Sequence, residues 1–333
     1  MSLSRPAQVG LATLLAGTAA VAAMTQTLDA YMLTLASFIG LHIMLAVSLT
    51  LTNGYTGLFS LGHPGFMAVG GYIAAILTYP LARKGYMMPD LPGFLATQQW
   101  DLLPALIVGG IGAALTAVVV GFPVLRLRGH YLAVATLGFI IIVRVLFNNS
   151  DGYTRGALGL SGMPRLTDIW WVFAWTALTV LVAWRVKHSS LGRAMMAVRE
   201  NELAAQCAGI SPMRVRMTAF VLGAFFAGVA GGLWAHLVTA ITPNSFSIML
   251  AFNLVVMVVV GGSGSLTGAI VAAIAISTLS EALRPLEESL NAFGLSQIVI
   301  ALMLILILVF RQRGLFGSRE PAFIFGDAKQ RVK

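Results

Sequence analysis

Charged residues are scarce in this chain of 333 residues. They make up 10% of it, whereas hydrophobic residues make up 58% and the mean hydropathy is +0.87. A soluble domain carries about 25% charged residues, so a soluble globular fold is excluded. Repeated apolar runs match the roughly 20 residues that a helix needs to cross the hydrocarbon core of a bilayer. We therefore expect an all-α, polytopic integral membrane helical bundle.

Cysteine and the motifs of several enzyme classes are also missing. Cys207 is the only cysteine, which excludes an intrachain disulfide and a cysteine-rich metal site, and we expect it to be a small core residue. The chain has no G-x-x-x-x-G-K-[ST] phosphate loop. His42, His63 and His236 are isolated from one another and from carboxylates along the chain, so we interpret them as structural. We expect a protein without enzymatic activity, cofactor or metal of its own.

The apolar runs predict ten transmembrane helices. Small residues recur four apart in several of them, which lets helix backbones approach closely in lipid. The first span could imitate a signal peptide, but we expect it to be retained. The predicted spans are residues 7–24, 30–52, 66–80, 102–125, 131–147, 170–184, 217–240, 248–260, 266–281 and 296–310. The rows of small residues are Gly109, Ala113, Ala117 and Gly121; Gly223, Ala227, Gly231 and Ala235; and Gly264, Gly268 and Ala272.

The basic residues predict the orientation of this bundle. Fifteen of the 21 Lys and Arg residues fall on one side if the N-terminus is cytoplasmic, and five fall on the other. Cytoplasmic loops carry the excess of Lys and Arg, so the count favours an N-in, C-in topology. Residues 1–317 then form the transmembrane domain and residues 318–333 a basic cytoplasmic tail. The net charge of +9 is spread along the chain without interleaved aromatics, which argues against a nucleic-acid partner.

The longest internal polar stretch, residues 185–216, is predicted to lie in the cytoplasm. Within it, residues 202–208 are mostly helix formers, and Gly209 followed by Pro212 is a typical helix stop. We expect a short, exposed helix here. The alternative is an ordinary basic loop that contacts only lipid headgroups.

This stretch resembles the loop by which permeases of ABC importers dock on their ATPase subunits. The core of the resemblance is Ala204-Ala205, three further residues, and Gly209. Together with flanking motifs it is similar to the M-type permease family of branched-chain amino acid importers, from about residue 40 to about residue 317. The flanking motifs are Leu191-Gly192-Arg193-Ala194, Val198-Arg199-Glu200-Asn201-Glu202, the run from Arg126 to Ala133, and Gly261-Gly262-Ser263-Gly264-Ser265.

The resemblance implies a role and a set of partners. The chain would be one of two related permeases, paired with an H-type permease, two ATPase subunits that bind ATP and Mg, and a periplasmic binding protein, in the inner membrane of a bacterium. It would move leucine, isoleucine and valine. Urea, short amides or other amino acids are alternative cargoes, and a secondary carrier or channel is the alternative mechanism. The residues implied in ATPase coupling are Arg199, Glu200, Glu202, Ala204, Ala205 and Gly209.

Two glycine-rich segments could line the translocation path. Residues 53–65 read N-G-Y-T-G-L-F-S-L-G-H-P-G, without a charge, and form either a break in a helix at membrane depth or a neutral cytoplasmic turn. Gly261 to Gly268 either lines the path or packs tightly at a turn. The candidate path residues are Asn53, Gly54, Tyr55, Thr56, Gly57, Ser60, His63 and Asn253. On the outer side, we expect the charges for docking a binding protein to be Arg83, Lys84, Arg284, Glu287 and Glu288.

Overall fold

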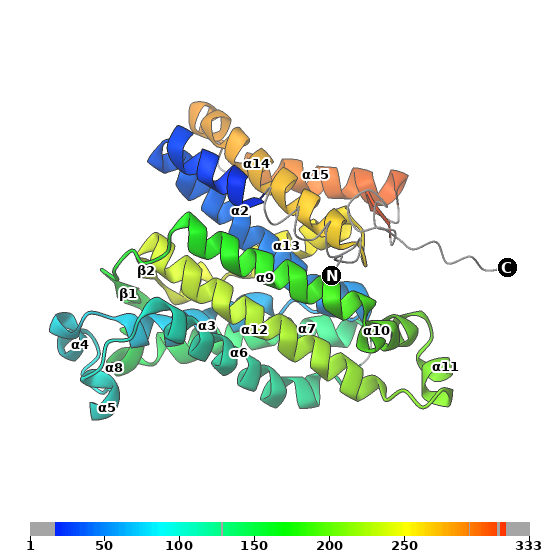
Figure 1. The fold of residues 1–333 in the computed structure, drawn as a ribbon, viewed down its shortest axis with the longest axis horizontal. Helices are drawn as coiled ribbons and strands as arrows, with labels where there is room; N and C mark the ends of the chain where they lie inside the picture. The colour runs from blue at the N-terminus through cyan, green and yellow to red at the C-terminus, as the bar shows by residue number, and fades with distance from the viewer. Residues whose placement is uncertain (1–16, 128, 293, 312–313, 318–333) are drawn as a thin grey trace, which may run out of the picture.

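The structure, a computed structural model, describes residues 17–127, 129–292, 294–311 and 314–317. Seven helices in this part of the chain are long and apolar enough to cross a membrane. They are α2 with its π-helical continuation η1 (Ala30–Leu49 and Thr50–Tyr55), α6 (Leu102–Val124), α7 (His130–Asn148), α9 (Ile169–His188), α12 (Pro212–Val238), the turn η3 with α13 (Pro243–Ser245 and Ile248–Gly261) and α14 (Leu266–Leu290). Two 16-residue helices, α3 (His63–Thr78) and α15 (Leu295–Phe310), belong to the same bundle (Figure 1).

Short elements gather at the two ends of this bundle (Figure 1). One end, which we call the far end, holds α4 (Leu81–Met87), α5 (Gly93–Ala96), α8 (Asp151–Thr154), η2 (Gly156–Leu158) and the strands β1 (Leu160–Ser161) and β2 (Ala240–Ile241). The strands pair antiparallel, with Leu160 opposite Ile241. The other end, which we call the coupling end, holds α10 (Ser190–Glu200) and α11 (Glu202–Cys207).

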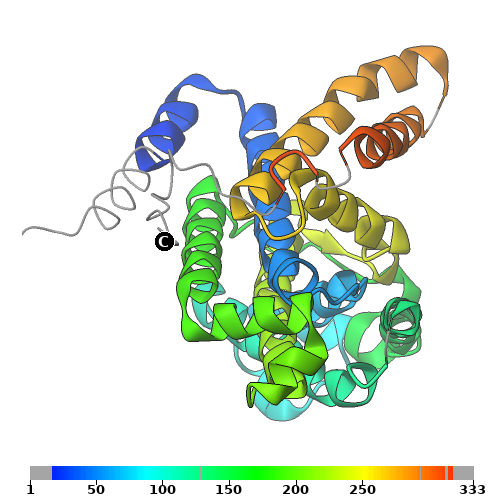
Figure 2. The ribbon, with the colours of Figure 1, turned by 90° about the vertical axis from the view of Figure 1, so that its right-hand side faces the viewer.

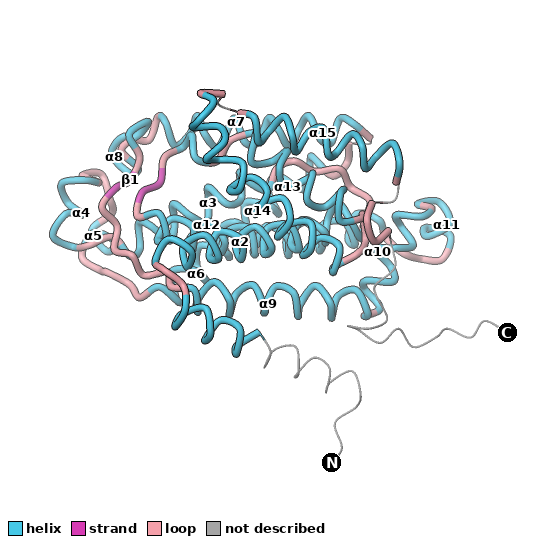
Figure 3. Tube along the Cα trace, turned by 90° about the horizontal axis from the view of Figure 1, so that it is seen from above, coloured by secondary structure: helices cyan, strands magenta, loops and turns pink. Residues whose placement is uncertain are grey.

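The core lies where α3, α6 and α12 cross at glycines, and Figure 3 shows α3 and α12 in the middle of the molecule. A Cβ atom added at Gly109 of α6 would lie 2.7 Å from the carbonyl oxygen of Gly70 in α3. One added at Gly228 of α12 would lie 2.5 Å from Cβ of Ala113 in α6. Neither contact leaves room for a side chain, so the helix backbones themselves are in contact. The predicted small-residue rows of α6 and α12 are buried, which confirms their packing role.

Each predicted span from residue 30 onward coincides with a helix, although the bounds differ. The segment predicted as 266–281 continues to Leu290, because Pro285 is accommodated within α14. The segment predicted as 217–240 begins earlier, at Pro212, where proline suits the first turn of a helix. Residues 17–27 are helical, but the rest of the first predicted span and the predicted tail 318–333 lie outside the described residues.

The chain between α2 and α3 is irregular at residues 56–62 and enters the bundle. The backbone N–H of Leu61 donates to Oγ1 of Thr136 in α7 at 3.0 Å. Thr136 lies six residues from the start of α7, which is about 9 Å along the helix. Most of this non-helical segment is buried against protein, the setting in which such backbone is tolerated inside a membrane, whereas Gly57 and Phe59 are exposed.

Candidate functional site

Two short helices, α10 and α11, lie at the coupling end. The side chain of the residue that precedes each helix caps its N-terminus. Ser189 Oγ accepts a hydrogen bond from the N–H of Gly192 at 3.2 Å and so caps α10. Asn201 Oδ1 accepts from the N–H of Ala204 at 3.0 Å and caps α11. These side chains satisfy N–H groups that a helix N-terminus otherwise leaves unpaired. We call residues 189–209 the coupling segment.

Gly209 ends α11 in the left-handed conformation. Its φ is +80°, and its N–H donates to the carbonyl of Gln206 at 2.9 Å. The next N–H, that of Ile210, donates to the carbonyl of Ala205 at 3.0 Å. This pair of bonds is the Schellman motif, which requires a residue that tolerates positive φ. The predicted short helix and its glycine stop are thus confirmed.

The outer surface of α11 mixes one large apolar side chain with small residues. Leu203 is 74% exposed, and Ala204 is also exposed. Ala205 is only 4% exposed and packs with Ile210 in an apolar cluster at the coupling end. The sole cysteine, Cys207, is exposed in the last turn. Its predicted place in the core is therefore wrong, because α11 buries the face that carries Ala205, and Cys207, two residues further on, lies on the opposite face.

The two glutamates of the coupling segment have different surroundings. Both carboxylate oxygens of Glu202 accept from Arg216 of α12, at 3.2 and 2.9 Å, so this pair holds α11 against α12. Such two-point pairs fix geometry as well as charge. Glu200 has a side chain that is 80% exposed and lies 4.0 Å from Arg199. Glu200 is thus the more exposed carboxylate of the segment.

Arg199 points back toward the bundle. Its Nη1 donates to the carbonyl of Gly54 at 2.6 Å and to that of Ser263 at 3.0 Å. Nearby, Lys187 Nζ donates to the carbonyl of Gly264 at 2.9 Å. The coupling segment and both predicted glycine-rich segments therefore meet at one junction, although they lie far apart in sequence. Seen from the coupling end, α10 lies beside the end of α2 (Figure 2).

Most of the predicted path residues between Asn53 and His63 are buried in this chain, and Gly57 is exposed. The half-buried Asn53 holds the irregular turn together, since its Nδ2 donates to the carbonyl of Ser60 at 3.0 Å and its Oδ1 accepts from the N–H of Ser60 at 3.1 Å. Oγ1 of Thr56 donates to the carbonyl of Thr52 at 2.7 Å. Lining of a path by these residues stays a prediction.

Asn253, the remaining predicted path residue, lies apart from this junction. It is half-buried in α13, eight residues and so about 12 Å before Gly261 at the helix end. At that end, Gly261 packs directly against Gly268 of α14. Gly264 belongs to the turn before α14, with φ +109°, and so departs from the predicted helical row.

The three isolated histidines each contact a hydroxyl on another helix. His42 Nδ1 lies 2.8 Å from Ser277 Oγ. His236 Nε2 lies 2.6 Å from Thr78 Oγ1. His63 Nε2 lies 3.2 Å from Ser48 Oγ. These contacts tie helices together, as the structural interpretation predicts.

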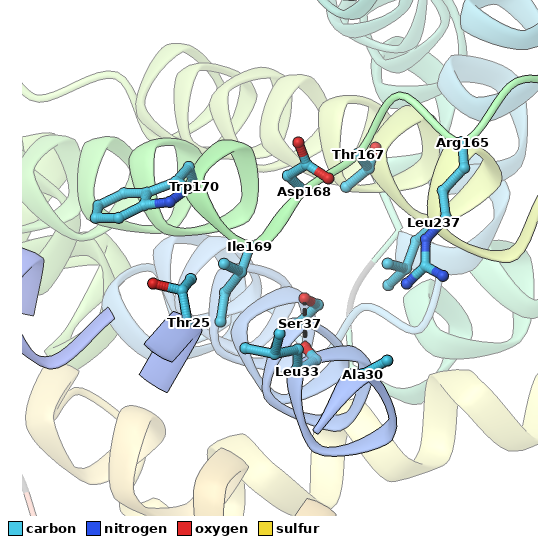
Figure 4. A pocket seen from close by; sticks show the side chains of 10 residues that line it. All are labelled: Thr25, Ala30, Leu33, Ser37, Arg165, Thr167, Asp168, Ile169, Trp170 and Leu237. Atoms are coloured by element: carbon cyan, nitrogen blue, oxygen red, sulfur yellow. Dashed lines mark hydrogen bonds between the residues drawn. The ribbon is translucent and has the colours of Figure 1, made fainter. Parts of the chain in front are cut away.

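A pocket of about 310 Å³ lies at the far end, where α2 and α9 begin. Figure 4 shows Arg165 on one side of it, while Asp168 and Thr167 lie above the α2 residues Leu33 and Ser37. Arg165 Nη2 donates to Thr34 Oγ1 at 2.9 Å. The walls offer a guanidinium, a carboxylate and apolar groups. The predicted path residues are not among those that line it in the described part of the chain.

Lys84 also lies at the far end. The sequence predicts it as one of the charges that dock a binding protein, and this prediction is wrong. The residue is 1% exposed, and its Nζ donates to the carbonyl of Gln98 at 2.7 Å. Burial lowers the pKa of its ammonium group. The ammonium group therefore stabilises the fold through this hydrogen bond and is not accessible to a partner protein.

Comparison with known families agrees with this arrangement. The model of the family described as "Branched-chain amino acid transport system / permease component" matches residues 31–308. The chain belongs to this family. The matched range covers α2 to α15 almost completely, so the whole bundle, including the coupling segment of this permease, is part of the family fold.

Several curated relatives resemble this permease. It is 32% identical to the high-affinity branched-chain amino acid transport system permease protein LivM of Escherichia coli K12, over 84% of its own length and 69% of the relative's. It is 24% identical to the probable LivM of Methanocaldococcus jannaschii, covering 84% and 91% of the two chains. It is 23% identical to LivH of Escherichia coli K12, covering 84% and 92%. No solved structure gives a significant match.

Two residues of this permease belong to the candidate site in the structure but were not predicted from the sequence, namely Leu203 and Lys187. Leu203 is an apolar side chain on a helix that was itself predicted to be exposed, and this conflict was the available signal. Lys187 had no distinguishing signal, because a lysine near the end of a span is also what the positive-inside rule predicts. Its contact with Gly264 depends on residues 77 positions apart.

Proposed function

We propose that this permease is one transmembrane subunit of an ATP-binding-cassette importer that carries leucine, isoleucine and valine into the cell. The observation that carries the proposal is the coupling segment. Its exposed tip, with Leu203 and Glu200, suits docking on a motor subunit, and its Arg199 contacts the bundle. Family membership and the relatives named LivM support the substrate class.

The proposed topology has ten spans with both termini in the cytoplasm. The coupling end would face the cytoplasm, and its described basic residues support this orientation under the positive-inside rule. The far end would face the periplasm. The described basic residues of the coupling end are Arg126, Arg185, Lys187, Arg193, Arg199, Arg214, Arg216 and Arg311.

The proposed partners are an H-type permease, two ATPase subunits that bind ATP and Mg, and a periplasmic binding protein. The translocation path would form at the interface of the two permeases in the bacterial inner membrane. At the far end, the exposed Arg284 and Glu288, which lie 3.4 Å apart, are suited to dock the binding protein. Arg83 is exposed there as well.

Uptake by the reconstituted complex tests this function. The permease, its H-type partner, the two ATPases and the binding protein would be assembled in proteoliposomes with ATP on the ATPase side. We expect leucine, isoleucine and valine to accumulate, and each to compete with the others. Accumulation of urea or a short amide in their place would overturn the substrate assignment. Accumulation without ATP or the ATPases, as in a secondary carrier or channel, would overturn the mechanism.

A further inference from the structure

Arg199 joins the end of one transmembrane helix to the turn between two others. Gly54, whose carbonyl it binds at 2.6 Å, lies in the last turn of η1. Ser263, whose carbonyl it binds at 3.0 Å, lies two residues beyond the end of α13. Carbonyls at helix C-termini lack partners within the helix and carry partial negative charge. Gly54 provides such a carbonyl, and Ser263 provides a carbonyl of the turn before α14, so the guanidinium joins a helix end to that turn.

The Arg199 side chain lies in a slot between two glycines. A Cβ atom on Gly57 would lie 2.9 Å from Arg199 Cγ, and one on Gly264 would lie 2.8 Å from its Nη1. Both glycines have positive φ, +69° and +109°. A side chain at either position would therefore meet the arginine and strain the backbone. One glycine from each of the two glycine-rich segments therefore makes room for Arg199.

The rest of α10 is attached to the same part of the bundle. Met195 and Val198 are buried with Tyr55 of η1 and Leu266 of α14 in one apolar cluster. The remaining face of α10 is more open, and Arg193 on it is exposed. A displacement of α10 would therefore push on η1 through this cluster. Through Arg199, the same displacement would also act on the turn between α13 and α14.

We propose that Arg199 is a strut, a positioning residue that transmits ATP-driven movement of the coupling segment to η1 and to the turn between α13 and α14 at the same time. The inference rests on the function proposed above and adds the residue through which motor and gate communicate. The two segments that Arg199 joins would then move as one unit.

The first test separates transmission from docking. In the reconstituted complex, Arg199→Ala should keep its ATPases through purification and continue to hydrolyse ATP. Leucine transported per ATP should fall by about tenfold, a size typical of coupling between sites. Arg126→Ala is the matched control, because this exposed arginine lies at the same end of the bundle but outside the coupling segment, where it stacks on the ring of Phe122, and it should transport like the wild type. Gly264→Ala, which keeps the arginine but puts a Cβ atom 2.8 Å from the position of its Nη1, should displace the guanidinium and reproduce the uncoupling.

A second readout does not depend on the cargo. Ser263→Cys in a Cys207→Ser background places a thiol at the exposed Ser263 position of the junction. We expect a non-hydrolysable ATP analogue to change its rate of labelling by a maleimide, and Arg199→Ala to abolish that change. This response separates the two proposals, since it would persist in a complex that moved no branched-chain amino acid.

Three results would contradict the proposed role of Arg199. Arg199→Ala could transport as much leucine per ATP as the wild type. It could lose its ATPases at an unchanged yield of permease, which would make Arg199 a docking residue. The nucleotide response of Ser263→Cys could also survive Arg199→Ala.

Discussion

The crossing of α3, α6 and α12 and the coupling segment are built on opposite principles. At the crossing, glycines bring backbones into contact and leave no space for movement. In the coupling segment, capped short helices are attached through a small apolar cluster, the Glu202 to Arg216 pair and the Arg199 junction. The proposed coupling of ATPase movement to the translocation path would need both a tightly packed body and a segment attached to it by few, specific contacts.

The largest effect on stability is expected at the crossing. Gly228→Val would force a branched side chain against Ala113 and should destabilise the permease by about 3 kcal/mol or more, the upper range for overpacking. Gly138→Val is the matched control, because a Cβ atom at Gly138 of α7 meets nothing within 4 Å. Thermal unfolding in detergent measures both. Equal melting temperatures for the two variants would contradict the account of the crossing.

A smaller loss is expected at the ion pair that holds α11 to α12. Glu202→Arg places a second positive charge beside Arg216 and should cost about 1 to 2 kcal/mol, since both groups are partly screened by solvent. Limited proteolysis of the coupling segment should become faster. Adding Arg216→Glu restores opposite charges and should restore protection. Failure of this exchange to recover any protection would show that the pair does not hold α11.

The cap of α11 should matter by a similar or smaller amount. Gly209→Ala puts a Cβ atom on a residue with φ +80° and should cost about 1 kcal/mol, with Gly209→Asn less costly. We expect fraying of α11 and several-fold weaker retention of the ATPases. Gly85→Ala in α4, which has free space and ordinary φ, serves as the control. Unchanged retention in Gly209→Ala would argue that the cap is dispensable for docking.

The smallest effect on stability should accompany a large effect on assembly. Leu203 is exposed, so Leu203→Asp should change the free energy of unfolding by no more than about 0.5 kcal/mol. Burial of this side chain against the ATPase would instead make the charged variant lose its ATPases. Co-purification, compared with the exposed far-end variant Tyr86→Asp, measures this. Normal retention in Leu203→Asp would place the docking surface elsewhere.

Features governed by local chemistry were predictable from the sequence, and features governed by distant contacts were not. Apolar runs located the helices, and Gly209 followed by Pro212 located the end of α11, because caps and spans depend on neighbouring residues. The direction of Arg199 was not predictable. Its partners, Gly54 and Ser263, are 145 and 64 positions away, and an arginine on a basic loop equally suits docking.

The same limit explains the other departures. A lysine in a polar loop is normally exposed, whereas Lys84 is buried with its Nζ donating a hydrogen bond to the carbonyl of Gln98, fourteen positions away. Cys207 has the size of a core residue, but it lies on the face of α11 opposite the buried Ala205. Residues 53–65 combine glycines with hydroxyls, a composition shared by turns and by breaks inside membranes. The burial of most of them depends on contacts with distant helices, such as that between Leu61 and Thr136 of α7.

The most direct test of the central claim, that the coupling segment is the ATPase-docking element, uses the cysteine that the chain already has. Cys207 is exposed on α11, so a maleimide should label it rapidly in the permease pair without ATPases. We expect labelling to be strongly slowed when the ATPases are bound and to recover when they are removed. Tyr86→Cys at the far end, in a Cys207→Ser background, should label equally in both states. Equal labelling of Cys207 with and without the ATPases would contradict the account.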